Sequence, residues 1–213
     1  NTYRMSSSGS EIALAKDPNN DLMWRHDMRR LSAEEIRDSI LNVTGQLNLK
    51  MGGPSIYTEV PRDVLATASR PGAAWGKSSE EDRNRRSVYI FVKRSLHEPF
   101  LASFDWADTD NTCDVRFVTT VPTQTLTMLN SKFLNDQAGI FSSYLQKKAG
   151  DDVDEKVRLA LSRVLCREPV KNEIDGCVKL IKEFQAEDKF NAEQAFKYFC
   201  LLALNLNEFV YLD

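Results

Sequence analysis

From Pro122 onward, apolar residues recur at spacings of three and four, and this periodicity restricts the second half of the chain to helices. Four segments carry the pattern: 123–148, 152–166, 171–186 and 191–207. Gly150 and Pro169 separate the first three, because glycine commonly ends a helix and proline interrupts one. The fourth segment is apolar on nearly all sides from Phe196 to Leu206, which is typical of a helix at the centre of a bundle.

The first 121 residues contain weaker signals. A helix of one or two turns is expected over Glu11–Lys16. The clearest helix start is the S-x-x-E capping box of Ser32 and Glu35, in which each side chain satisfies a backbone amide of the other residue. An apolar stripe follows at Ile36, Ile40, Val43 and Leu47, and it predicts a helix of about four turns.

A short sheet is expected between these helices. Ser87–Lys93 (SVYIFVK) is rich in β-branched and aromatic residues and is the strongest strand candidate. Its expected partners are Leu47–Met51 and Val115–Thr119. Residues 57–86 show no periodicity and predict a long irregular loop, which in a compact domain is often functional or mobile.

These patterns predict a mainly α fold, in which a C-terminal bundle of about four helices packs on an irregular N-terminal half with a short β-sheet. We expect one domain over residues 1–213, divided into an irregular α+β half (1–121) and a helical bundle half (122–213), and forming a fragment of a longer chain. The length of 213 residues suffices for such a core.

The composition limits the classes of partner that the chain is expected to bind. Apolar residues are 42% and charged residues 28%, and the net charge is −3, so nothing in the overall balance favours nucleic acid or an anionic membrane. No apolar run approaches the ~20 residues that span a bilayer. The cysteines at 113, 166, 177 and 200 form no C-x-x-C pair and no haem-attachment motif, and both free thiols and a single disulfide are compatible with their spacing.

Arginines near the first helix and the expected strand are candidates for an anion-binding group, because guanidinium offers five donors in a planar fork. The set is Arg25, Arg29 and Arg30 before the first helix and Arg83, Arg85, Arg86 and Arg94 around the expected strand. Of these, Arg29, Arg30, Arg86 and Arg94 are the expected binding residues, with Tyr89 and His97 in the same region. Alternatively, these arginines pair with Asp105, Asp108 and Glu35 and hold the irregular half together.

An acidic stretch supplies the candidate metal ligands. Asp105, Asp108 and Asp110 place several oxygens on one loop, as a hard cation such as Ca²⁺ requires, although the spacing is not that of an EF-hand. The alternative is a solvated turn. Tryptophans 24, 75 and 106 fall in loop-rich segments, where they stack on sugar rings or, more commonly, anchor a core.

The order of motifs along the chain resembles the C-terminal half of a planctomycete cytochrome-C-associated domain of unknown function found in secreted proteins. The segments that carry the resemblance are Thr2–Arg4, Asp17–Asn20, Arg29–Asp38, Met51–Ser55, Arg85–Tyr89, Lys93–Ser95, Phe104–Asp105, Thr119–Leu126, Leu129–Asn130 and Leu204–Phe209.

The resemblance implies an extracytoplasmic bacterial protein whose partners are the N-terminal remainder of the same protein and a cytochrome c domain, which would carry any haem. It also implies a setting of polysaccharide utilisation. Two functional hypotheses follow. The first is an accessory module that docks the haem domain or holds a glycan through Arg29, Arg30, Arg86 and Arg94. The second is an enzyme that acts oxidatively on polysaccharide-derived substrates, with Arg86, Asp105, His97 and Tyr89 lining the site. A third possibility is a structural fragment that needs its missing half.

Overall fold

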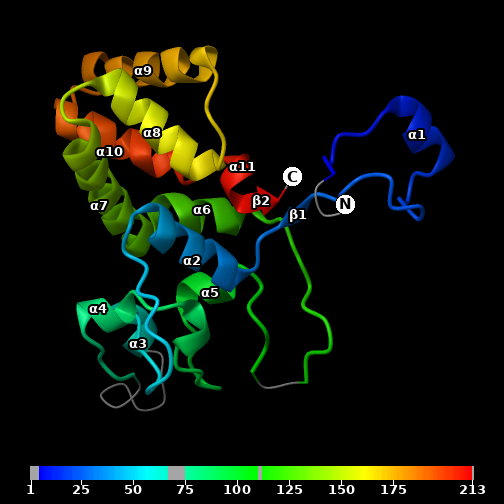
Figure 1. Cartoon of the computed structure of the whole chain (residues 1–213). Coiled ribbons are helices and arrows are strands. Elements are labelled where there is room, and N and C mark those ends of the chain that lie inside the picture. The colour runs from blue at the N-terminus through cyan, green and yellow to red at the C-terminus, as the bar shows by residue number, and fades with distance from the viewer. Residues whose placement is uncertain (1–4, 67–74, 110–111, 213) are drawn as a thin grey trace.

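The C-terminal half forms the expected bundle of four helices (Figure 1). They are α7 (Lys132–Ala149), α8 (Val153–Leu165), α9 (Lys171–Ala186) and α10 (Ala192–Ala203). The structure is a computed structural model that describes residues 5–66, 75–109 and 112–212. Within these residues the chain is mainly helical with one small antiparallel sheet, so the predicted fold class is confirmed.

Local signals explain where the bundle helices begin and end. The Ser131, Asp152 and Asn191 side chains each accept a hydrogen bond from an amide in the first turn of the helix that follows. Gly150 ends α7 with a φ of 66°, a conformation that glycine adopts without steric cost. Helix α10 packs against α7, α8 and α9, and six of its residues are buried, as expected for the central helix.

The expected single helix over 123–148 is wrong, because the chain forms α6 (Pro122–Asn130) and α7 on either side of Ser131. Ser131 is extended, with ψ 140°, and its Oγ accepts from the Leu134 amide, so it caps a new helix instead of continuing the old one. The last expected helix ends early at Ala203. Leu206 is extended and precedes a separate short helix, α11 (Asn207–Val210).

Helix α2 (Ala33–Val43) begins at the predicted capping box, with both reciprocal hydrogen bonds of Ser32 and Glu35 present. It ends at Val43, one turn before the expected Leu47, because Gly45 has a φ of 75° and the Leu47 amide bonds back to the Leu41 carbonyl. The expected loop at 57–86 contains two short helices in its described part, α3 (Arg62–Ala66) and α4 (Glu80–Arg83). Helix α5 (Pro99–Ser103) follows them.

The predicted strand at Ser87–Lys93 is also wrong. Ser87–Tyr89 forms a 3₁₀ turn, η3, because the Asp38 carboxylate accepts hydrogen bonds from both the amide and the hydroxyl of Ser87 at 2.7 Å. Near this turn, Asn48 forms an isolated β-bridge with Arg85, and Ile56 forms another with Ile90. The two-stranded sheet instead joins β1 (Arg29–Arg30) to β2 (Tyr211–Leu212).

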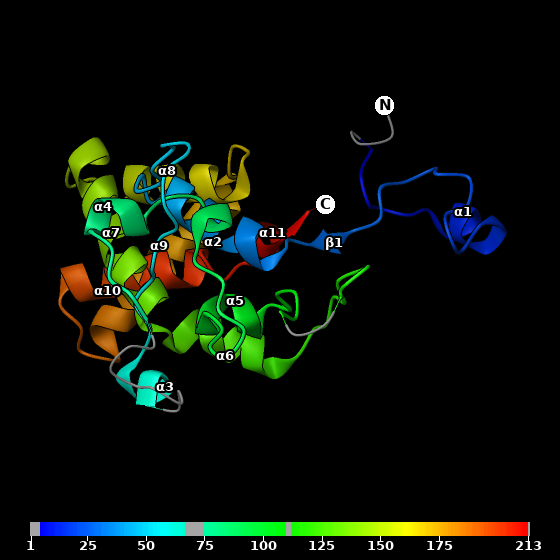
Figure 2. The ribbon, with the colours of Figure 1, turned by 90° about the horizontal axis from the view of Figure 1, so that it is seen from below.

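One apolar core unites the two halves of the chain. Ile36 and Ile40 of α2, Phe100 of α5, and Phe141 and Phe199 of the bundle belong to the same buried cluster. Outside this body, residues 5–28 form an arm with the expected short helix α1 (Glu11–Lys16), which buries none of its own residues (Figure 2). In the part of the chain that is described, no helix combines the length and apolar character needed to cross a membrane.

Candidate functional site

Buried Arg30 forms an ion pair with the partly exposed Asp105, with Nη2 2.7 Å from Oδ2, and Arg30 also donates to the Phe104 carbonyl at 3.2 Å. Thr119 donates to the same carboxylate from its amide and its hydroxyl. Burial raises the pKa of Asp105, but the Thr119 hydrogen bonds and the Arg30 charge outweigh it and leave that pKa below its usual value. Both residues therefore hold the segment before α6 against β1. This arrangement corresponds to the alternative in which the arginines pair with nearby carboxylates.

The remaining candidate arginines do not converge on one point. Arg29 pairs with Glu35 at 3.3 Å on an exposed edge, and Arg86 lies 3.7 Å from Asp38. Arg94 is exposed beyond η3. The Tyr89 hydroxyl accepts from the Gly52 amide at 2.9 Å, so it holds the glycine turn at 52–53.

A buried arginine of the wider candidate set, Arg85, supports this turn. Arg85 is 1% exposed, and its guanidinium lies 3.9 Å from the centre of the Tyr89 ring. It donates to three carbonyls, those of Lys50, Gly52 and Pro54. These bonds fix the backbone after α2, so Arg85 and Tyr89 have a structural role.

His97 and the tryptophans are likewise engaged within the fold. His97 Nε2 lies 2.8 Å from Thr109 Oγ1, and its ring meets the Trp106 ring edge-on at 6.1 Å. All three tryptophans are half-buried, and their indole nitrogens donate to Asp17, Thr58 and Glu34. They therefore act as anchors with partial exposure.

Among the described residues, no three or more His, Cys, Asp or Glu side chains gather closely enough to hold a metal ion. Asp110 lies outside the described residues, and the Asp105 carboxylate is occupied by Arg30 and Thr119. A Ca²⁺ ion at Asp105 would have to displace the Arg30 charge, so this carboxylate does not fit the ion as placed. Calcium binding by Asp105, Asp108 and Asp110 stays a prediction.

A cleft that was not anticipated runs along α7 and consists of two adjoining hollows. The outer groove has a volume of about 820 Å³ and the inner compartment about 340 Å³. Six residues line both: Glu59, Glu80, Arg83, Lys132, Asp136 and Ile140. Of the predicted site residues, Asp105 and Asp108 line a separate described pocket, and Arg83 is the member of the wider arginine set that lines the cleft.

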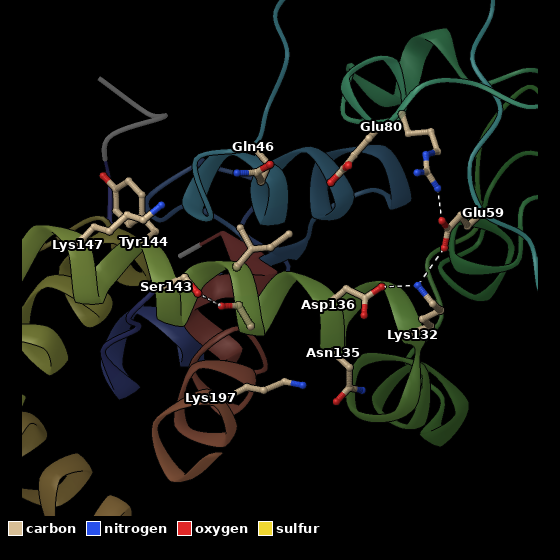
Figure 3. Close-up of a pocket in the computed structure, with 13 residues that line it drawn as sticks. Gln46, Glu59, Glu80, Lys132, Asn135, Asp136, Ser143, Tyr144, Lys147 and Lys197 are labelled. Atoms are coloured by element: carbon tan, nitrogen blue, oxygen red, sulfur yellow. Dashed lines mark hydrogen bonds and ion pairs between the residues drawn. The ribbon is translucent and has the colours of Figure 1, made fainter. Parts of the chain in front are cut away.

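A chain of charges, seen in Figure 3, belongs to the residues that line both hollows and so marks their boundary. Lys132 Nζ lies 3.0 Å from Glu59 Oε2 and 2.6 Å from Asp136 Oδ2, and Arg83 pairs with the other oxygen of Glu59. Lys132 and Arg83 hold the pKa of Glu59 below its usual value. The ionised forms of Glu59 and Lys132 are thus favoured. The boundary therefore carries hydrogen-bond donors and acceptors side by side.

The inner compartment is lined by two buried groups of opposite charge. Arg37 of α2 and Glu98, the N-cap of α5, are 4% and 5% exposed. Burial raises the pKa of Glu98, against the lowering effects of the Leu101 amide and Arg37. The guanidinium of Arg37 also lies over the Phe133 ring at 5.6 Å. The compartment is therefore lined by charged and polar groups together with apolar side chains such as Val60, Phe100 and Phe133.

The outer groove is open and polar. It is lined by Lys147 and Lys197 as donors and by the amides of Gln46 and Asn135 (Figure 3). Tyr144 lies toward the C-terminal end of α7, and its hydroxyl accepts from Arg163 at 3.2 Å. A ligand here meets side chains from α7, α10 and the segment after α2.

The sequence contained only weak signals for this cleft. Lys132 and Asp136 are four residues apart on one helix face, and Glu98 precedes a proline at a helix start. Both patterns are common on surfaces and at caps. Glu59 lies in a segment without periodicity, and its partners are distant in sequence.

A family model described as PSD1, protein of unknown function (DUF1553), matches residues 1–181. The matched range includes α2, the charged boundary of the cleft and most of the bundle, and it stops before α10. No curated protein and no solved structure matches the chain. Because the family model covers most of its length, the chain belongs to this family of proteins of unknown function.

Proposed function

We propose that this chain is an accessory module that binds glycan in the cleft along α7, within a larger extracytoplasmic bacterial protein associated with c-type cytochrome domains. The observation that carries the binding role is the charged boundary of Arg83, Glu59, Lys132 and Asp136, where donors and acceptors alternate beside an open groove. Sugar hydroxyls both donate and accept, so a saccharide satisfies such a surface better than a simple anion or cation does.

The setting of this proposal is supported by the resemblance of the motif string, from the Arg29–Asp38 segment to Leu204–Phe209, to the cytochrome-associated secreted proteins. The chain has no C-x-x-C-H motif, so haem would belong to the neighbouring domain. The measurement for this part is the intact mass and visible spectrum of the protein from its native source. A mass well above 24.2 kDa with a haem Soret band is expected, and a chromophore-free protein of 24.2 kDa contradicts the association.

Exposed apolar side chains on the arm and on the segment before α6 support docking to a larger partner. Leu22 is 81%, Val115 78% and Phe117 85% exposed. We propose these as contacts with the N-terminal remainder and the cytochrome domain.

The binding role is tested by calorimetric titration of the chain with cello-, xylo-, manno- and laminarihexaose. At least one probe is expected to bind with a Kd of about 1 mM or tighter. Lys147 lines the groove and Lys148 beside it does not, so Lys147→Gln is expected to weaken binding while Lys148→Gln leaves it unchanged. Absence of binding to every probe, or equal effects of the two variants, contradicts the proposal.

A further inference from the structure

The inner compartment differs from the outer groove in the burial of its walls. Arg37, Glu98, Phe100 and Gln137 line it, and none exposes more than 5% of its surface. No residue that lines the outer groove is buried to that degree. The compartment is therefore a recess into the body, whereas the groove is a surface along it.

The polar groups of the recess are held in place by the protein itself. Arg37 donates to the Arg85 carbonyl at 3.1 Å and to Ser87 Oγ at 3.2 Å. Glu98 accepts from the Leu101 amide through Oε2 at 2.7 Å. Gln137 accepts from Thr44 through Oε1 at 2.7 Å, which leaves its Nε2 as the donor that a ligand can use. Such fixed groups lower the ordering cost that the protein incurs when a ligand binds.

The size and lining of the recess suit one small ring. Its 340 Å³ is at the lower end of the range of about 300–1,000 Å³ for ligand pockets. Val60, Pro61, Phe133 and Ile140 supply apolar contact beside the polar groups. A pyranose ring has the same division, with C–H groups on its faces and hydroxyls at its rim. The recess adjoins the groove at the Lys132 boundary, because both hollows share that residue.

We propose that the inner compartment is a terminal subsite, which takes the last sugar ring of a glycan chain while the following rings lie in the outer groove past Lys132 and Asp136. This inference rests on the proposed function and adds to it that the module recognises chain ends. Glu98 and Gln137 bond the hydroxyls of the terminal ring, and Phe133 lies against its face.

The experiment compares the hexasaccharide that binds with a roughly tenfold longer chain of the same linkage, titrated at equal mass. If ends are recognised, the longer chain needs about tenfold more mass for half-saturation, because its ends are about tenfold fewer. Glu98→Gln keeps an oxygen for the Leu101 amide and is expected to weaken hexasaccharide binding at least tenfold. Val60→Phe, which narrows the recess from a loop, has the same expected effect, and Val92→Phe on an exposed site outside the cleft is its control.

Three outcomes are distinguishable. Half-saturation that tracks the number of ends, together with loss in both recess variants and not in Val92→Phe, supports the terminal subsite. Half-saturation that tracks total sugar mass, with both recess variants silent, overturns it and leaves groove binding intact. Failure of every probe to bind the unchanged chain overturns the proposed function, and the subsite with it.

Discussion

Lys132 and Glu59 are 73 residues apart in sequence, yet Lys132 Nζ lies 3.0 Å from Glu59 Oε2. This ion pair links the start of α7 to the loop before α3 and lies at the boundary shared by the two hollows of the cleft. Both side chains are more than half exposed, so the pair is accessible to solvent and to a ligand. Its contribution to folding is small for the same reason, because water and salt screen exposed pairs.

Replacing Lys132 with Met is therefore expected to affect binding more than stability. We expect the free energy of unfolding to change by less than about 1 kcal/mol, because the pair is exposed. Binding of the hexasaccharide is expected to fall at least tenfold, because a donor is lost at the boundary. Urea denaturation and calorimetric titration measure the two effects. Lys148→Met on the same helix is the control, and a Lys132→Met protein that binds normally contradicts the assignment.

The ion pair of Arg30 and Asp105 is expected to behave in the opposite way. Arg30 has a side chain that is 3% exposed, so Asp105→Ala leaves a buried charge without its partner. The expected loss is about 3 kcal/mol in the free energy of unfolding. Asp114→Ala, at an exposed position nearby, is expected to change it by less than about 0.5 kcal/mol. Equal effects in urea denaturation would show that the pair does not hold the segment before α6.

Glu98 is expected to make stability depend on pH. Burial raises its pKa in the folded state above the unfolded value, so the folded chain binds this proton more tightly. The stabilisation is fully present below the unfolded pKa of 4.5 and is lost as pH rises through the raised pKa. Glu98→Gln removes this dependence, so the variant should gain stability relative to the parent as pH rises above 4.5. Urea denaturation of both proteins across that window is the measurement, and parallel curves contradict the shift.

The four cysteines are expected to differ in reactivity, because all four are free thiols and their burial differs. Cys113 and Cys166 are exposed, whereas Cys200 is fully buried and burial raises its pKa. Maleimide should label the two exposed residues in minutes and Cys200 only after unfolding. Mass spectrometry of peptides from native and urea-treated protein gives the order. Labelling of Cys200 in the native protein at the rate of Cys113 would contradict the packing of α10.

The strand and sheet predictions in the first half of the chain failed for one reason, which is that contacts between residues distant in sequence decide the backbone there. Ser87–Lys93 has the composition of a strand, but the Asp38 carboxylate of α2 bonds the Ser87 amide and turns the backbone into η3. In the same way the sheet forms between Arg29–Arg30 and Tyr211–Leu212, which are two residues each and separated by nearly the whole chain. A pairing of that length leaves no periodicity to detect.

What the sequence alone determined is the set of helices whose signals are local: the capping box at Ser32, the stop at Gly150, and the apolar periods of α8, α9 and α10. These signals act over a few residues, so they survive without knowledge of the fold. Only the tertiary structure decided the sheet and the cleft. Glu59, Glu98 and Lys132 come from three separate segments, and their charges acquire a common site when α2 packs against both α5 and α7.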